Sequence, residues 1–336
     1  MRRSLARLSL PLREPFATAH GVVAARELLL LRLEDDDGAV GYGEAAPFEP
    51  YDGVSLDEVA AALTNGTAPG APPQARTAEE MARLDLEARR EGRPIGEPGA
   101  ERIAVNRTLP AGPPEEVAAR AREGVQEGYA CFKLKVGLPD DLERVAAVRE
   151  AIGPWPALRI DANGAWSAEQ AVEAVAALVP FDLQLVEQPC RTLKEMAEVR
   201  RAVAVPVAAD ESVASADDVR TAATEGACDT VNVKLAASGG FGAARDMLRA
   251  ASASGLSAFL SSTLDGPWGI AAALQLAASE NLSLACGLAT LELFDASLAR
   301  ALPPPVQGLM AVPQGPGLGV AVDDGAIAEV LVEEIE

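Results

Sequence analysis

The stretch Cys131-Phe132-Lys133-Leu134-Lys135-Val136 alternates basic and apolar residues after its first position. Alternate residues of a β-strand point to opposite faces, so Lys133 and Lys135 share one face and the three apolar residues share the other. Such a pair is usually a solvated strand face, but the 29 basic residues of this chain include only four lysines, at positions 133, 135, 194 and 234. Unlike Arg, Lys can lose its proton, and a proton-transfer site is one place where this difference matters.

A short apolar strand followed by an amphipathic helix recurs along the chain from about Ile103. The predicted strands cover residues 103–105, 132–136, 158–160, 183–186, 205–209, 230–233, 258–261 and 284–287. Because consecutive strands are joined through helices, the pattern predicts parallel β/α units. A closed eight-strand α/β barrel is the natural arrangement, and an open doubly wound sheet is the alternative.

The first hundred residues have a different pattern, with strands at 4–12, 27–33 and 39–44 followed by helices at 55–63 and 77–90. This order indicates a small α+β unit. The segments Pro15–Gly21 and Phe48–Gly53 show no periodicity and are interpreted as plain connections. The tail from Gly308 is strand-like again, and we expect it to return to the N-terminal unit.

Acidic residues follow three consecutive predicted strands of the barrel, at Asp161, Glu187 and Asp210. The carboxyl ends of the strands of a β/α barrel form the rim where active sites lie. Three carboxylates close together repel one another unless a cation joins them. Hard oxygen ligands favour Mg²⁺, and zinc is disfavoured because neither His nor Cys is nearby.

Lysines lie on the strands that precede and follow this acidic group, and Lys234 faces Lys133 and Lys135 across the predicted barrel mouth. A carboxylate substrate bound to the metal would place its α-carbon between opposed ammonium groups. This arrangement suits abstraction of the proton α to the carboxylate, giving an enediolate that the metal stabilises. Lys133 and the cation are expected to lower the pKa of Lys135, which makes Lys135 the candidate base.

The formal net charge of −21 disfavours binding to nucleic acid or to anionic membranes. We therefore expect a small-molecule carboxylate as the partner, and the sequence does not distinguish a monomer from a homo-oligomer. The four cysteines are far apart, and no signal peptide or membrane span is visible, so a cytoplasmic location is expected. His20 is the only histidine, which argues against a Ser-His-Asp triad and against a His-rich zinc site.

The chain resembles the enolase superfamily in its muconate-lactonising subgroup, over nearly its whole length. The matching motifs are Tyr42–Pro47, Lys133-x-Lys135, Asp161-Ala-Asn163, Glu187-Gln-Pro189, Ala209–Ser212, Asn232-Val-Lys234 and Gly315–Gly319. The resemblance implies a modified (β/α)7β barrel over residues 101–305. It also implies an α+β capping domain over residues 1–100, completed by residues 306–336. Asp161, Glu187 and Asp210 would be the ligands of Mg²⁺, with Mn²⁺ able to replace it.

Within this subgroup, three stretches are similar to o-succinylbenzoate synthases of the actinobacterial type: residues 186–193, 261–265 and 285–290. The implied reaction is the syn-dehydration of 2-succinyl-6-hydroxy-2,4-cyclohexadiene-1-carboxylate in menaquinone biosynthesis, with Lys135 as base and Lys234 as the cation that stabilises the enediolate. The candidate substrate-binding residues are Asn163, Ser261, Ser262, Gly287 and His20. An N-succinylamino acid racemase or dipeptide epimerase that uses the opposed lysines is the alternative.

Overall fold

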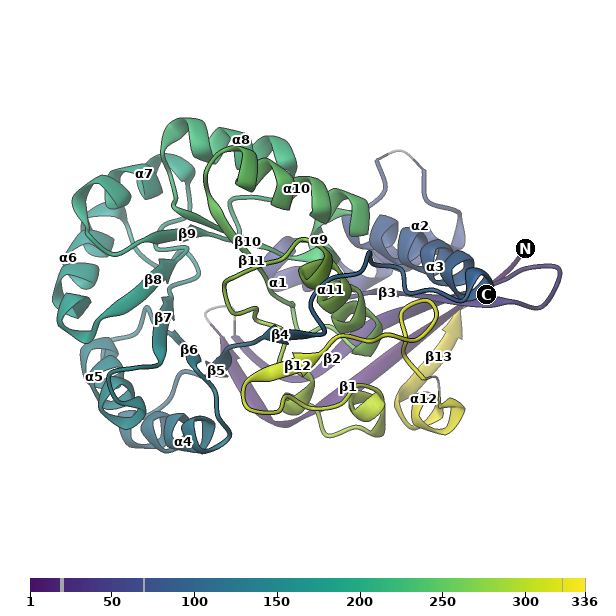
Figure 1. The fold of residues 1–336 in the computed structure, drawn as a ribbon, viewed down its shortest axis with the longest axis horizontal. Helices are drawn as coiled ribbons and strands as arrows, with labels where there is room; N and C mark the ends of the chain where they lie inside the picture. Colours follow the sequence, from purple (N-terminus) through teal and green to yellow (C-terminus); the bar gives the residue numbers. More distant parts are fainter. Residues whose placement is uncertain (19–20, 69, 322, 336) are drawn as a thin grey trace.

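The computed structural model describes residues 1–18, 21–68, 70–321 and 323–335, and it contains a curled parallel sheet beside an antiparallel sheet (Figure 1). The parallel sheet has the strand order β11-β10-β9-β8-β7-β6-β5 and an outer layer of helices. The antiparallel sheet has the order β13-β1-β2-β3. In the described part of the chain, no helix is long and apolar enough to cross a membrane.

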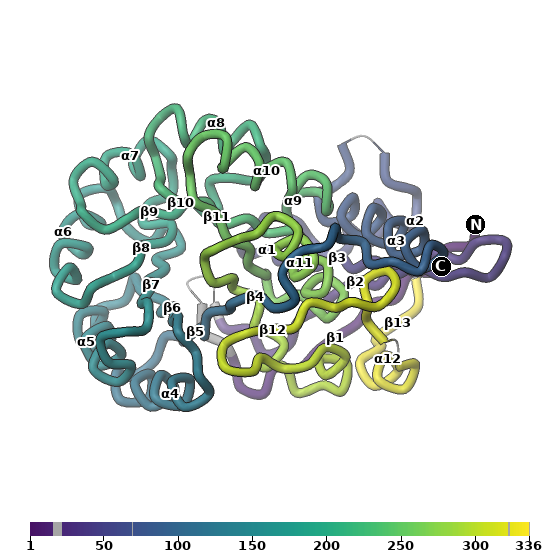
Figure 2. Tube along the Cα trace, in the orientation of Figure 1, coloured from purple at the N-terminus to yellow at the C-terminus, as the bar shows by residue number. Residues whose placement is uncertain are grey.

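The antiparallel sheet is a capping unit built from both ends of the chain. Its strands are β1 (Arg2–Thr18), β2 (Gly21–Glu34), β3 (Val40–Ala45) and β13 (Leu331–Ile335). Its helices are α1 (Glu49–Asp52), α2 (Leu56–Thr64) and α3 (Pro73–Glu91). The pairing of Leu5 with Ile335 confirms that the tail returns to the N-terminal unit, and Figure 2 shows the two chain ends close together.

Helix α3 lies directly on strand β3 because two glycines leave room for it. A Cβ atom at Gly41 would lie 2.2 Å from the carbonyl oxygen of Ala82, and one at Gly43 would lie 1.9 Å from that of Ala78. Any side chain at these two positions would therefore push the helix off the sheet.

The parallel strands are β5 (Arg107–Leu109), β6 (Cys131–Lys135), β7 (Ala157–Asp161), β8 (Leu183–Glu187), β9 (Val207–Ala209), β10 (Thr230–Val233) and β11 (Ser257–Leu260). Their helices are α4 (Pro114–Gln126), α5 (Asp141–Ile152), α6 (Ala168–Leu178), α7 (Leu193–Ala202), α8 (Ala216–Glu225), α9 (Leu235–Ser238), α10 (Phe241–Ala253) and α11 (Pro267–Ser279), whereas α12 (Asp324–Val330) packs against β1 of the capping unit. Short 3₁₀ helices cover Val179–Phe181, Leu291–Leu293 and Ser297–Ala301. This arrangement confirms a barrel of parallel β/α units.

Two of the eight expected barrel strands are corrected by the structure. The segment predicted as the first strand forms β4 (Arg102–Ala104), which pairs antiparallel with β12 (Leu309–Ala311), and the first parallel strand is β5. The segment predicted as the last strand makes only two isolated parallel bridges, Val105–Cys286 and Ser261–Gly287. These bridges join the two edges of the seven-stranded sheet and close the barrel.

Helix α11 is buried on all sides from Pro267 to Ala278. It packs against β11 of the barrel, β3 of the capping sheet and β4, which explains why its sequence is apolar all round. The helix thereby joins the barrel to the capping unit.

Candidate active site

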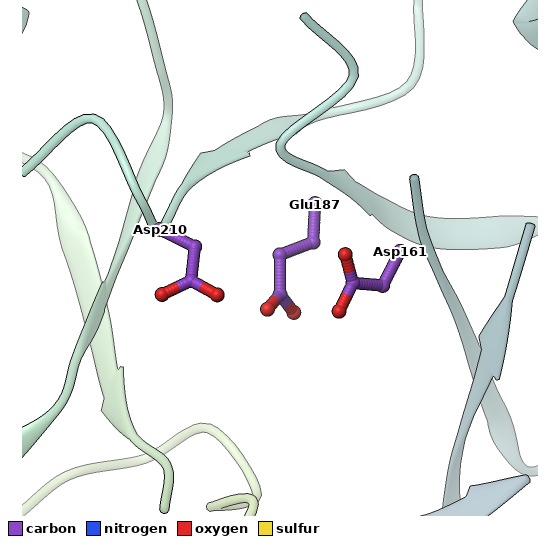
Figure 3. Close-up of side chains that lie close together, drawn as sticks. All are labelled: Asp161, Glu187 and Asp210. Atoms are coloured by element: carbon purple, nitrogen blue, oxygen red, sulfur yellow. The ribbon is translucent and has the colours of Figure 1, made fainter. Parts of the chain in front are cut away.

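Three carboxylates meet at the C-terminal ends of neighbouring barrel strands (Figure 3). Asp161 ends β7, Glu187 ends β8 and Asp210 directly follows β9, and one oxygen of each lies within 4.8 Å of the others. The side chains are at most 2% exposed. The register explains the convergence, because Lys135 pairs with Asp161 and Asp161 pairs with Glu187 across adjacent strands.

The charges in this cluster shift one another's protonation. Burial, Asp161 and Asp210 raise the pKa of Glu187 to about 7, and burial raises the pKa of Asp210. Burial opposes ionisation of Asp161 too, but Lys133 and Lys135 hold its pKa well below the usual range. Burial likewise opposes the charge on Lys133, yet the carboxylates around it raise its pKa, so the repulsion between the two lysines is outweighed there.

The three lysines hold the carboxylates from both sides. Lys133 Nζ lies 2.9 Å from Glu187 Oε1 and 3.0 Å from Asp161 Oδ2. Lys135 Nζ lies 2.6 Å from the same Asp161 oxygen, and Lys234 Nζ lies 2.5 Å from Asp210 Oδ2. Strands β7, β8 and β9 separate β6 from β10, so the structure places Lys133 and Lys135 on one side of the acidic cluster and Lys234 on the other.

The donor set fits a divalent cation. Glu187 Oε2 is fully buried and accepts no hydrogen bond from the described residues, which is costly unless another positive group meets it. Burial, together with Asp161 and Asp210, also raises the pKa of Glu187 in spite of the lysines, so a further cation would stabilise its ionised form. Carboxylate oxygens at a rigid rim are ligands for a hard cation, so Asp161, Glu187 and Asp210 could hold a metal.

The three lysines of the cluster line a pocket. Its described lining comprises Phe48, Tyr51, Thr108, Lys133, Lys135, Asn163, Lys234, Ser261, Ser262, Thr263, Leu264, Gly287, Thr290 and Leu293. All the substrate-binding candidates except His20 therefore lie on one pocket, and His20 falls outside the described residues.

The polar candidates on the pocket wall are already engaged by neighbours. Asn163 accepts a hydrogen bond from Lys135 Nζ at 2.8 Å. The hydroxyls of Ser262 and Thr290 lie 2.7 Å apart, and one donates to the other. Each hydroxyl carries one proton, and the hydrogen bond between them uses only one of the two. The pair can therefore donate its other proton to a ligand.

Tyr51 was missed by the sequence analysis because its segment shows no periodicity. It lies in α1 of the capping unit, and its hydroxyl donates to Asp210 Oδ1 at 2.9 Å. Its ring lies 3.8 Å from Lys234 Nζ, and burial raises the pKa of the phenol. The capping unit thus contributes directly to the acidic cluster and to the lysine beside it.

The pocket wall at Thr263 is fastened to the capping unit by Arg26 and Glu44. Arg26 is buried and donates to the carbonyls of Thr263 and Ala46, at 3.1 and 2.8 Å. Glu44 accepts hydrogen bonds from the backbone N–H groups of Gly266 and Gly269, at 2.7 and 3.4 Å.

These two glycines form the cradle for the Glu44 carboxyl group. A Cβ atom at Gly266 would lie 2.6 Å from Glu44 Oε2, and one at Gly269 would lie 2.9 Å from Oε1. Burial, together with the nearby Asp265, raises the pKa of Glu44 to about 8. Neither Arg26 nor Glu44 could be recognised as a contact to the barrel from the sequence of the hairpin alone.

The family model for enolase C-terminal domain-like proteins matches residues 116–326, which include the acidic cluster and all three of its lysines. The chain belongs to the enolase superfamily. It is also 36% identical over 325 residues to the o-succinylbenzoate synthase of Thermobifida fusca (strain YX), covering 95% of this chain and 90% of that protein. It is 35% identical over 314 residues to the o-succinylbenzoate synthase of Mycobacterium tuberculosis (strain ATCC 25618 / H37Rv), covering 91% and 83%.

Solved structures of enolase-superfamily enzymes share the whole fold. The N-succinyl Arg/Lys racemase of Bacillus cereus ATCC 14579 aligns with a TM-score of 0.92 at 25% identity, over 99% of this chain and 98% of that one. The 2-chloromuconate cycloisomerase of Rhodococcus opacus 1CP aligns with a TM-score of 0.92 at 27% identity, over 99% of both chains. This superfamily member is therefore an enzyme with a capped, TIM-like barrel.

Proposed function

We propose that the protein is an o-succinylbenzoate synthase, which converts 2-succinyl-6-hydroxy-2,4-cyclohexadiene-1-carboxylate into o-succinylbenzoate and water. The observation that carries the proposal is that Lys135 and Lys234 line one pocket from opposite sides of a buried cluster of three carboxylates. The identity to synthases from two actinobacteria over more than 90% of the chain supports the same reaction. The product would feed menaquinone biosynthesis, and a cytoplasmic location is part of the proposal.

Asp161, Glu187 and Asp210 would hold Mg²⁺, or Mn²⁺ in its place, and the bound cation would neutralise the charge that develops on the substrate carboxylate. Lys135 removes the proton α to that carboxylate and returns it to the departing hydroxide on the same face, so that water leaves. Lys234 stays protonated and stabilises the enediolate from the opposite face.

The other pocket residues orient these groups. Lys133 holds Glu187 and Asp161 in place through its two contacts. Asn163 and Asp161 together fix the direction of the Lys135 side chain, since both accept a hydrogen bond from its Nζ atom.

The far wall of the pocket suits a succinyl chain. Apart from the three lysines, the lining residues that the structure describes are uncharged: hydroxyl-bearing, amide, aliphatic or aromatic residues and a glycine. Such a wall can bind a neutral or anionic chain through hydroxyl donors, and it offers no carboxylate partner for an ammonium group. The described lining thus disfavours substrates with a free amine or a cationic side chain.

An N-succinylamino acid racemase is the second candidate, because lysines on both sides of one α-carbon are what two-base racemisation needs. The likeness to the Bacillus cereus racemase favours it. A dipeptide epimerase is less well supported, since no Asp-x-Asp pair is present at residues 289–294. Glu292, the acidic residue there, is occupied by Tyr129 and Arg107, whose Oη and Nη1 atoms lie 2.8 and 3.1 Å from Glu292 Oε2.

The two candidates are separated by assaying both reactions with the same purified protein. The synthase predicts formation of the aromatic product, followed by its ultraviolet absorbance, with the cyclohexadiene carboxylate as substrate. The racemase predicts exchange of the α-proton of N-succinyl amino acids in D₂O, followed by NMR. Exchange without dehydration would refute the synthase. Activity that survives both a chelator and Glu187→Gln would refute the metal assignment.

A further inference from the structure

The two oxygens of the Glu187 carboxylate have different surroundings. Oε1 accepts hydrogen bonds from Lys133 Nζ and from Asn232 Nδ2, both at 2.9 Å. Oε2 is buried and has no hydrogen-bond partner among the described residues. One oxygen is thus held by two donors, and the other has a free acceptor position.

The hydrogen-bond directions in this cluster are fixed by the carboxylate. Glu187 Oε1 can only accept, so the Asn232 amide must present its NH₂ group to it. The amide oxygen of Asn232 then faces Ser261, whose Oγ atom lies 2.8 Å away, and an amide oxygen can only accept. The Ser261 hydroxyl must therefore donate, and the relay runs from Ser261 through Asn232 to Glu187.

The relay crosses three separate barrel elements. Glu187 ends β8, Asn232 lies in β10, and Ser261 directly follows β11. Asn232 is 1% exposed and Ser261 is 4% exposed, so water cannot easily replace either hydrogen bond. The Ser261 backbone is also fixed, because its N–H group donates to Val233 at 3.1 Å.

Gly287 makes room for the first member of the relay. A Cβ atom at Gly287 would lie 2.8 Å from the Ser261 Cβ atom, so a larger residue would displace the serine. The absence of a side chain at Gly287 thus allows Ser261 to stay within hydrogen-bond distance of Asn232.

We propose that Asn232 and Ser261 are positioning residues that orient Glu187 toward a divalent cation, an inference that rests on the metal site of the proposed function. Asn232 fixes the rotation of the Glu187 carboxylate so that Oε2 faces the cation. Ser261 prevents the Asn232 amide from turning its oxygen toward the carboxylate. Because its only hydroxyl proton is used in this way, Ser261 cannot donate to an anionic substrate, and the Ser262–Thr290 pair is left for that task.

The test is the dissociation constant of Mg²⁺, measured by isothermal titration calorimetry on chelator-treated full-length protein. Asn232→Ala should weaken binding by about 10- to 100-fold, the usual effect of losing a residue that orients a metal ligand. Ser261→Ala should weaken binding in the same direction, because the amide is then free to turn. Ser261→Thr keeps the hydroxyl and should restore the wild-type dissociation constant.

Ser262→Ala is the matched control, since it removes a hydroxyl from the same pocket wall but not from the relay, and it should bind Mg²⁺ as the wild type does. The thermal midpoint and near-ultraviolet circular dichroism of each metal-free variant report general loss of structure. Variants with unchanged midpoints and weakened Mg²⁺ binding support the relay. Unchanged Mg²⁺ binding in both Asn232→Ala and Ser261→Ala would overturn it, as would loss of binding only in step with loss of the fold.

Wild-type turnover tests the proposed function independently of the relay. If the wild type forms no o-succinylbenzoate but the variants lose Mg²⁺ affinity as expected, the relay stands and the synthase assignment falls. If the wild type forms the product and the variants bind Mg²⁺ unchanged, the relay falls alone.

Discussion

The Glu44 carboxyl group should make the metal-free protein less stable as the pH rises from about 5 to about 8, and Glu44→Gln should remove this effect. In the unfolded chain, Glu44 ionises near its ordinary pKa of 4.5, whereas burial and Asp265 raise its pKa in the folded protein to about 8. Between these two values the folded state keeps a proton that the unfolded state releases. Rising pH therefore favours unfolding throughout this window.

The size of the effect follows from the difference in pKa. Each pH unit inside the window changes the free energy of unfolding by about 1.4 kcal/mol, so the interval from pH 5 to pH 8 is worth up to about 4 kcal/mol. Glutamine cannot ionise, but it keeps the shape of Glu44 and an oxygen that can accept the Gly266 N–H group. The free energy of unfolding of the variant, relative to that of the wild type, should therefore rise by up to about 4 kcal/mol from pH 5 to pH 8.

Urea unfolding at a series of pH values, followed by tryptophan fluorescence in the presence of a chelator, measures this difference. Buried carboxyls away from Glu44, such as Glu187, affect both proteins equally, so the difference reports the ionisation of Glu44 together with its coupling to Asp265. Glu49→Gln, at an exposed position, is the control and should follow the wild type. A difference that stays constant with pH would refute the reasoning. It would mean that the N–H groups of Gly266 and Gly269 outweigh burial and keep Glu44 ionised.

Three further substitutions probe the site. Lys135→Arg should abolish turnover, measured by product absorbance, while calorimetric Mg²⁺ binding persists, because Arg keeps the charge but cannot act as a base; residual turnover near the wild-type rate would contradict this. Gly287→Ala should destabilise the protein by about 1–3 kcal/mol in urea unfolding, because its Cβ meets Ser261. Tyr51→Phe loses the hydrogen bond to Asp210 and should weaken Mg²⁺ binding by about tenfold, as titration calorimetry would show.

The acidic cluster could be predicted from the sequence because it depends on strand ends. Parallel neighbours place their carboxyl ends at one rim, so Asp161 and Glu187 come together once the strands are recognised. The position of Lys234 follows in the same way, since it comes directly after β10, in which Val231 and Val233 alternate with Thr230 and Asn232. That inward-facing asparagine was the available signal for the relay, because an amide in a buried strand needs a polar partner.

The contacts from the capping unit could not be predicted in this way. Tyr51 and Asp210 are 159 positions apart, and no pattern within the Tyr51 segment indicates that it reaches the barrel. The first barrel strand was placed wrongly for a different reason. Ile103-Ala-Val105 is more apolar than Arg107-Thr-Leu109, so hydrophobicity alone pointed to the segment that pairs with β12.

The position of β13 has a consequence for how the chain is made. Strand β1 lies between β2 and β13, so until residues 331–335 leave the ribosome the segment Leu5–Leu8 of β1 lacks its β13 partner. An unpaired edge strand is a template for pairing with another chain. The pairing of the first strand is therefore incomplete until the last strand has been synthesised. A truncated chain that ends before β13 would expose the unpaired edge of β1.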